Sequence, residues 1–167
     1  MKKVAIIGAG LSGLTAAHFL ESFADVFIFE KSKGLGGRMS TRRHERFSFD
    51  HGTQYFTVKT KHFSDFIKPL IDTGAVKRWD TKCVNIVNYS VVEEQNWKDQ
   101  QPRFVGVPGM NQLVKCISTG RKILMNKRVV AIEVGSEGAV RDEDGKIYKG
   151  FDLIIIAVPA PQALSLL

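Results

Sequence analysis

The sequence has few cysteines and no long apolar stretch. Cys83 and Cys116 are the only cysteines among 167 residues, too few for a disulfide framework and without the spacing of a zinc site. The longest apolar runs, at residues 4–9 and 153–158, are far shorter than the roughly 20 residues that a membrane-spanning helix needs. The basic start is followed by too short an apolar run for a secretory signal. We therefore expect a cytoplasmic chain with no metal site and no membrane partner.

The composition excludes several protein classes. Hydrophobic residues make up 44% and charged residues 25% of the chain. These fractions exclude a disordered tail, a collagen-like chain and a coiled coil. The length is within the usual size of one domain.

Positive charge is concentrated in one short segment. The formal net charge is +7, and between residues 31 and 46 a single acid, Glu45, accompanies six basic residues, namely Lys31, Lys33, Arg38, Arg42, Arg43 and Arg46. A nucleic-acid-binding protein usually spreads its basic residues over a face or a helix. We therefore expect no nucleic-acid partner, and the segment is either a solvated loop or part of a site for an anion.

Strand and helix patterns alternate at the start of the chain. Residues 3–7 form a β-branched run, residues 11–22 carry apolar side chains at helical spacing, and residues 25–29 form a second apolar run. This βαβ unit predicts an α/β fold with a parallel sheet. Two further helices are expected at residues 60–72 and 110–118.

The remaining apolar runs predict further strands. Short strand-like pieces lie between residues 75 and 106, interrupted by a polar loop at 93–101, and indicate an antiparallel excursion. The pair Asp144-Gly145 has the turn chemistry of a hairpin. Residues 152–158 are apolar almost throughout, so we expect them in the buried middle of the parallel sheet. The other expected strands are residues 122–125, 128–134, 139–141 and 146–148.

The first turn carries a dinucleotide-binding pattern. Residues 8–13 read G-x-G-x-x-G and lie where a strand enters a helix, the context that this motif requires. Gly8 permits the turn, Gly10 lets a pyrophosphate approach the backbone, and Gly13 lets the helix pack closely on the strand. Glu30, at the end of the second strand, can accept hydrogen bonds from ribose hydroxyls and repels a 2′-phosphate. The pattern favours a dinucleotide over a merely glycine-rich turn.

A second glycine pair narrows the choice of dinucleotide. Gly36-Gly37-Arg38-Met39 resembles the G-G-R segment of flavoproteins of the amine oxidase type. Two glycines allow a backbone turn against a bulky cofactor, and Arg38 can place a guanidinium near pyrophosphate charge. Residues 49–56 (FDHGTQYF) and 105–110 (VGVPGM) resemble the corresponding segments of the renalase-like branch of that family.

The resemblance covers nearly the whole chain and implies a fold and a cofactor. The implied fold is a Rossmann-like FAD- or NAD(P)-binding fold with a parallel central sheet, a β-meander and the start of an antiparallel substrate-domain excursion. The implied cofactor is FAD. The residues implied to contact it are Gly8, Gly10, Leu11, Ser12, Gly13, Glu30, Lys31, Gly37, Arg38, His51, Gly52, Gln54, Val129 and Ala157.

His51 invites a catalytic role because it belongs to the segment implied to lie beside the flavin. The simpler interpretation is that Asp50-His51-Gly52 forms a turn whose side chains bind nearby backbone groups. The sequence therefore assigns no catalytic residue.

Members of this family are about twice as long as this chain. We expect residues 1–74 and 104–167 to form the FAD-binding domain and 75–103 to be part of a substrate domain whose remainder is absent. Catalysis by the chain alone is therefore in doubt. The surface left uncovered by the missing half is a candidate for association with another chain.

Three functions follow as hypotheses. The first is the FAD-binding part of an oxidoreductase that transfers a hydride from a small substrate to flavin, with reoxidation by oxygen or another acceptor. The resemblance implies a dihydronicotinamide dinucleotide isomer or an amine as substrate, and the basic segment is compatible with an anionic dinucleotide. The second is a non-catalytic module that binds a dinucleotide or a protein. The third is an NAD-dependent dehydrogenase, which the Gly-Gly-Arg segment disfavours.

Overall fold

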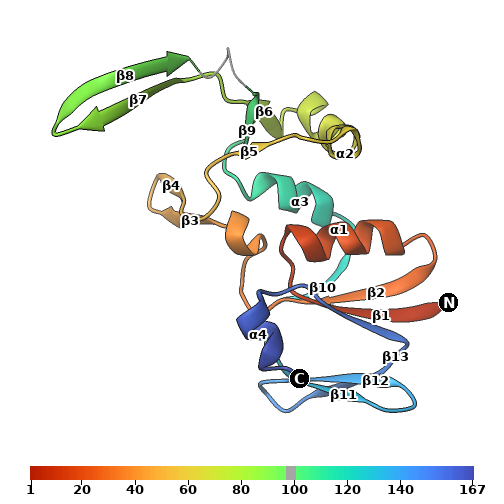
Figure 1. Cartoon of the computed structure of the whole chain (residues 1–167). Coiled ribbons are helices and arrows are strands. Elements are labelled where there is room, and N and C mark those ends of the chain that lie inside the picture. The colour runs from red at the N-terminus through yellow and green to blue at the C-terminus, as the bar shows by residue number, and fades with distance from the viewer. Residues whose placement is uncertain (97–100) are drawn as a thin grey trace.

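A four-stranded parallel sheet forms the centre of the computed structural model, which describes residues 1–96 and 101–167 (Figure 1). Its strand order is β10-β2-β1-β14. The strands pair in register, with Val4 of β1 opposite Val26 of β2 on one side and Leu153 of β14 on the other. Their bounds are β1 Lys2–Ile7, β2 Ala24–Phe29, β10 Lys122–Leu124 and β14 Leu153–Ile156.

Both faces of this sheet are covered. On one face, helices α1 (Leu11–Leu20) and α3 (Gln112–Ser118) pack against side chains such as Val4 and Ile6. On the other, Ala5 and Ile7 pack with residues of an antiparallel meander. Successive residues of β1 thus face opposite layers, as expected of a strand buried on both sides. The meander consists of β11 Val129–Val134, β12 Gly138–Asp142 and β13 Ile147–Phe151.

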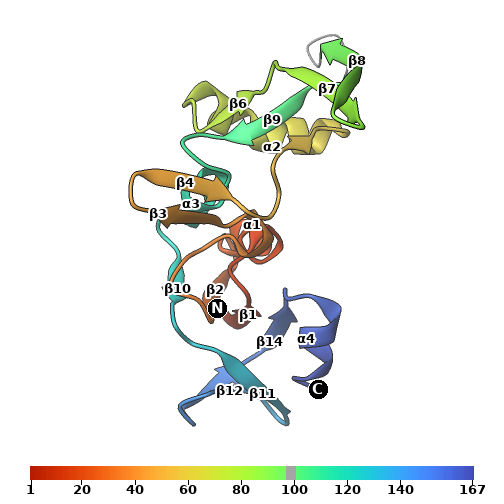
Figure 2. The same cartoon turned by 90° about the vertical axis from the view of Figure 1, so that its left-hand side faces the viewer.

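A second layer lies beyond α1 and α3, at the top of Figures 1 and 2. It contains a three-stranded sheet of order β5-β9-β6, helix α2 and a hairpin formed by β7 and β8. The side chain of Thr60 caps α2 by accepting the Phe63 amide proton. The bounds are β5 Phe56–Thr57, α2 Lys61–Asp72, β6 Val76–Arg78, β7 Lys82–Val87, β8 Ser90–Asn96 and β9 Arg103–Gly106.

Two short pieces complete the fold. A helical turn η1 (Gly37–Met39) leads into a hairpin of β3 (Thr41–His44) and β4 (Phe47–Asp50), and the final helix α4 spans Ala160–Leu164. Among the described residues, no helix has the length and apolarity needed to cross a bilayer.

The α/β class with its parallel sheet and meander is confirmed, but three local predictions were wrong. The apolar run at 152–158 was expected in the middle of the sheet, but it forms an edge strand, β14. The prediction failed because apolar composition indicates that both faces of a strand are covered and not that it has a neighbour on each side. Leu153 is accordingly exposed. The polar segment from Glu93 to Asn96 is part of β8, where cross-strand hydrogen bonds outweigh its composition.

The third error concerns the basic segment. Thr41–His44 and Phe47–Asp50 pair as strands, so a loop, one of the two interpretations of the basic segment, is wrong for the part of it that lies in these strands. Part of the expected polar loop, residues 97–100, lies outside the described residues. The division into 1–74 with 104–167 and 75–103 stays a prediction.

Candidate functional site

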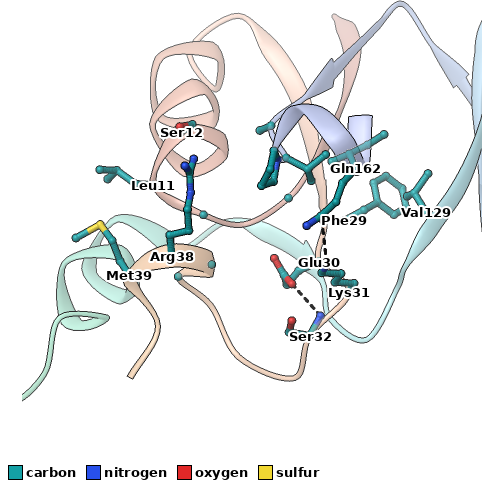
Figure 3. A pocket seen from close by; sticks show the side chains of 18 of the residues that line it. Leu11, Ser12, Phe29, Glu30, Lys31, Ser32, Arg38, Met39, Val129 and Gln162 are labelled. Atoms are coloured by element: carbon teal, nitrogen blue, oxygen red, sulfur yellow. Dashed lines mark hydrogen bonds between the residues drawn. The ribbon is translucent and has the colours of Figure 1, made fainter. Parts of the chain in front are cut away.

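A cavity of about 870 Å³ opens at the carboxyl ends of β1, β2 and β14. This is the position at which open α/β sheets bind their ligands. Figure 3 shows how side chains from the two glycine loops, the end of β2, β11 and α4 surround it. The sequence-predicted residues in its lining are Gly8, Gly10, Leu11, Ser12, Glu30, Lys31, Gly37, Arg38, Val129 and Ala157.

The first glycine loop is fixed by close backbone packing. The Gly8 amide donates to the Phe29 carbonyl at 2.8 Å, and Gly8 has a φ of +106°, which favours glycine. A Cβ atom at Gly13 would lie 2.0 Å from the Gly8 carbonyl oxygen. Gly13 therefore lies beneath the loop, where it lets α1 approach β1, and not in the cavity lining.

The start of α1 is an anion-binding element. No side chain caps this helix at Gly10, and its first turn contains no acidic residue. The first amide protons of a helix have no partner within the helix, and the helix dipole adds positive potential there. A pyrophosphate at this end would accept those hydrogen bonds.

Glu30 is a buried carboxylate held by backbone donors. Its side chain accepts the Ala9 amide proton at 2.9 Å and the Ser32 amide proton at 2.8 Å, and the residue is 6% exposed. In the part of the chain that the structure describes, no basic group forms an ion pair with it. Each carboxylate oxygen keeps a further acceptor site, so Glu30 can accept two ribose hydroxyls.

The second glycine pair is attached to the first loop. Gly36 donates its amide proton to the Ala9 carbonyl at 3.1 Å, and Gly10 and Gly36 form an isolated bridge. This attachment brings Arg38 to the cavity near Ser12 (Figure 3). Arg38 forms no ion pair with any described carboxylate, so its charge is available to an anion.

Besides Gly13, three sequence-predicted residues lie outside the lining: His51, Gly52 and Gln54. The imidazole of His51 lies 3.1 Å from the Ser40 hydroxyl. A Cβ atom at Gly52 would lie 2.1 Å from the Arg38 carbonyl oxygen, which accepts the Thr53 amide proton at 2.8 Å. This segment therefore supports the backbone of Arg38, and direct contact of the three residues with FAD stays a prediction.

The cavity also includes residues that the sequence did not single out. Phe56 and Phe63 come from the second layer, and Gln162 from α4 accepts a hydrogen bond from Lys31 at 3.0 Å. No local pattern marks these residues, since their place in the lining depends on how distant elements pack. Ser32 could have been found, because it follows Glu30 by two residues and α/β sites gather loops at strand ends.

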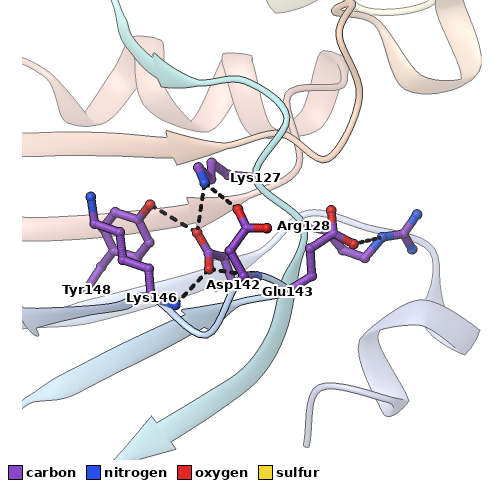
Figure 4. Close-up of polar contacts among 7 residues, drawn as sticks. Lys127, Arg128, Asp142, Glu143, Lys146 and Tyr148 are labelled. Carbon is purple, nitrogen blue, oxygen red and sulfur yellow. Dashed lines mark hydrogen bonds and ion pairs between the residues drawn. The ribbon is translucent and has the colours of Figure 1, made fainter.

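A cluster of hydrogen-bonded and ion-paired side chains surrounds Lys127, a residue of the cavity lining (Figure 4). The carboxylate of Asp142, almost fully buried, accepts protons from the Tyr148 hydroxyl at 3.1 Å and from the backbone of Lys146 at 2.9 Å, and pairs with Lys127 at 3.3 Å. Lys127 also pairs with Asp144 at 2.7 Å. The Lys127 amide donates to the Glu30 carbonyl at 2.8 Å, so the cluster is connected to the end of β2.

The cluster shifts the pKa values of its members. Burial by itself raises the pKa of Asp142, but the hydrogen bonds from Lys146, Lys127 and Tyr148 outweigh it and hold this pKa below the ordinary 3.8. Burial, with the hydrogen bond to Asp142, raises the pKa of Tyr148 above 10.0. Hydrogen bonds to Asp144 and Asp142 raise the pKa of Lys127 above 10.5.

These shifts predict how stability depends on pH. The lowered pKa of Asp142 stabilises the fold above pH 3.8, and this contribution is lost as the pH falls through the folded-state value. The raised pKa of Tyr148 stabilises the fold below pH 10.0 and is lost as the pH rises through its folded-state value. The cluster should therefore cause no change in the urea-denaturation midpoint of the wild type between about pH 4 and 10. The Asp142→Asn variant should have lower midpoints, and its midpoints should fall less steeply in acid.

The matched control for this prediction is Asp72→Asn, which removes an exposed carboxylate that pairs with the exposed Lys68. Its midpoints should follow those of the wild type, since exposed pairs contribute little. Equal midpoints for both variants would show that the cluster does not hold the wall.

Comparison with known proteins agrees with this geometry. Residues 6–70 match the family model "NAD(P)-binding Rossmann-like domain", and residues 89–166 match "Flavin containing amine oxidoreductase". Mouse (Mus musculus) renalase is 28% identical over 99% of the chain and 49% of its own length. The chain is therefore similar to FAD-dependent, amine oxidase-like proteins. FAD is accordingly the cofactor that these similarities imply.

Other known proteins are similar over a shorter stretch of sequence or in fold alone. A 4,4'-diapophytoene desaturase of Staphylococcus aureus is 38% identical over 40% of the chain and 15% of its own length. A putative protoporphyrinogen oxidase from Exiguobacterium superposes with a TM-score of 0.72 at 12% identity, covering 99% of this chain and 61% of that one, and so shares the fold. The chain spans about half the length of mouse renalase.

The cavity fits FAD on structural grounds as well. It combines an uncapped helix start, the guanidinium of Arg38, which has no ion pair among the described residues, and the buried carboxylate of Glu30 with free acceptor sites. The helix start and the guanidinium match a pyrophosphate, and the carboxylate matches a ribose. The cavity volume is within the range of sites that enclose small ligands.

Proposed function

We propose that the chain is the FAD-binding part of a flavin-dependent oxidoreductase. The observation that carries the proposal is the joint position of Glu30, the start of α1 and Arg38 in one cavity. Glu30 would hold the adenosine ribose, and the amides after Gly10 together with Arg38 would hold the pyrophosphate. Val129 and Lys127 would form the wall beside the adenosine.

The opposite part of the lining is suited to an aromatic ring system. Phe56, Phe63 and Leu113 line it, and Thr53 adds a hydroxyl. The chemistry that bound FAD supplies is acceptance of a hydride from a substrate, followed by reoxidation by oxygen or another acceptor. The residues of this chain would orient the cofactor and exclude water from one side of it.

The described lining offers few candidates for proton transfer. Glu30 is its only acidic residue, and no histidine belongs to it in the described part of the chain. His51, outside the lining, would act only through Ser40 and the Arg38 segment. This agrees with a reaction in which the cofactor carries the chemistry and the protein supplies position and electrostatics.

The substrate class that we propose is taken from the proteins that this chain resembles. Renalase-like proteins imply dihydronicotinamide dinucleotide isomers, and the wider family implies amines. Arg42 and Arg43, which a dinucleotide substrate could contact, lie on the β3–β4 hairpin and do not line the cavity. The basic residues that line the cavity are instead Lys31, Arg38, Lys127 and Arg128.

The test is anaerobic reduction of the FAD-loaded chain. We expect a dihydronicotinamide dinucleotide isomer to bleach the visible flavin absorption faster than it bleaches free FAD, and readmitted oxygen to restore the band with peroxide formation. An amine that bleaches it instead would move the substrate assignment to the wider family. Bound FAD that neither substrate class reduces would favour a non-catalytic binding module, and tight binding of NAD without flavin would favour a dehydrogenase.

A further inference from the structure

The β3–β4 hairpin is an exposed arm with a fixed base. At its base, the Thr41 hydroxyl donates to the Asp50 carboxylate at 2.5 Å. The same carboxylate accepts the Met110 amide proton at 3.0 Å, and the Asn111 amide donates to the Thr41 hydroxyl oxygen at 3.2 Å. The residues between Thr41 and Asp50 are all exposed, and the arm stands out from the body in Figures 1 and 2.

One face of this arm presents two aromatic rings. Phe49 lies opposite Arg42 and Phe47 lies opposite His44, so these four side chains share a face. Phe47 is 51% and Phe49 54% exposed, and their ring centroids are 6.3 Å apart. The Arg46 guanidinium lies over the Phe47 ring, 5.1 Å from its centroid. Two adjacent half-exposed rings on a fixed arm form an apolar tip that the fold does not cover.

The arginines around the tip are not neutralised. Glu45 is the only acid between Arg42 and Arg46. Within residues 1–96 and 101–167, no carboxylate forms an ion pair with Arg42, Arg43 or Arg46. None of the three lines the cavity, so their charge is not used there. The arm therefore combines positive charge with apolar rings and fits an anionic partner that accepts both.

We propose that the β3–β4 hairpin docks the protein onto an anionic lipid surface, with Phe47 and Phe49 entering the interface. Arg42, on the same face, and Arg46, over the Phe47 ring, would meet acidic headgroups, and Arg43 on the opposite face would add positive charge within a Debye length of them. Aromatic rings combined with basic side chains are the composition of segments that lie in the membrane interface. A stable protein partner needs roughly 800 Å² on each side, far more than a convex arm with four-residue strands presents. A second copy of this chain is disfavoured as the partner, because pairing two such hairpins would bring their positive charges together.

This inference departs from the expectation of no membrane partner, which rested on the absence of a spanning segment. Docking at the surface requires no such segment. The cytoplasmic leaflet carries acidic lipids, so the inference is compatible with the expected cytoplasmic location.

Flotation with lipid vesicles tests the proposal. The wild-type chain should float with phosphatidylcholine vesicles that contain phosphatidylserine, remain behind with phosphatidylcholine alone, and lose binding as the salt concentration rises. The triple variant Arg42→Gln, Arg43→Gln, Arg46→Gln should bind the acidic vesicles on the order of 100-fold more weakly, since each basic residue near the surface contributes several-fold. The double variant Phe47→Ser, Phe49→Ser should also lose binding while keeping its charge.

Matched controls separate the hairpin from general charge and apolarity. Lys59→Gln, Lys77→Gln, Lys149→Gln removes the same charge elsewhere, and Ile86→Ser, Tyr89→Ser removes two exposed apolar side chains from the other hairpin. Both should bind like the wild type, and circular dichroism should show all variants folded. Failure of the wild type to float, equal losses in the controls, or binding to polyglutamate or single-stranded DNA in place of vesicles would overturn the proposal.

Discussion

Replacing Gly13 with alanine is expected to destabilise the protein more than any other single-methyl change in the first βαβ unit. The added Cβ atom would lie 2.0 Å from the Gly8 carbonyl oxygen and 3.2 Å from a methyl carbon of Ile6. The contact is with backbone, so no side chain can move aside, and α1 must shift away from β1. Overpacking of this kind costs about 3 kcal/mol or more, a large share of the stability of a typical domain. Urea denaturation followed by circular dichroism measures it.

The matched control for this prediction is Gly34→Ala. Gly34 is exposed and has no heavy atom within 4 Å of the position that a Cβ would occupy. Its denaturation midpoint should stay close to that of the wild type or rise slightly, because alanine restricts the unfolded chain. Equal midpoints for Gly13→Ala and Gly34→Ala would show that the close approach of α1 and β1 is not required.

The second large effect is expected on FAD affinity from the loss of the Glu30 carboxylate. If Glu30 accepts two ribose hydroxyls, the Glu30→Ala variant should bind FAD about 100-fold more weakly or worse, since a hydrogen bond to a charged group contributes about 1.5–3 kcal/mol. Glu30→Gln, which keeps the shape and one acceptor, should lose less. Quenching of flavin fluorescence gives the dissociation constants.

Two comparisons identify the cause of that loss. The variant Glu133→Ala removes an exposed carboxylate outside the cavity and should bind FAD normally. FMN has no adenosine, so its weaker binding should be the same in the Glu30 variants and the wild type. A parallel loss of FMN affinity would mean instead that Glu30 acts by holding the Ala9 and Ser32 amides.

Much of the sheet and of the cavity could be predicted because local pattern and function coincide there. The β-branched runs of β1 and β2 and the glycines that follow β1 allow one path for the backbone. This path explains why Gly8, Gly10 and Glu30 line one cavity, while their contact with FAD stays a prediction. The Gly-Gly-Arg segment lies at the same cavity, because two glycines at positive φ form a tight turn that brings Arg38 to it.

Other features depended on contacts between distant elements. The edge position of β14 follows from which strand pairs with β1, and no feature of its own sequence shows this. Asp50 was read as part of a local turn, yet its carboxylate accepts a proton from Met110, sixty residues further on. Gln162 and Phe63 reach the cavity only through the packing of α4 and α2. Such partners are fixed by tertiary packing, which local patterns do not report.

The most direct test of the account is equilibrium binding of FAD to the purified wild-type chain, with ADP as competitor. The account predicts saturable binding with a shifted flavin spectrum and displacement by ADP, because Glu30 and the start of α1 recognise the part that the two ligands share. Absence of FAD binding, or NAD binding that FAD does not displace, would contradict the assignment of this cavity to FAD.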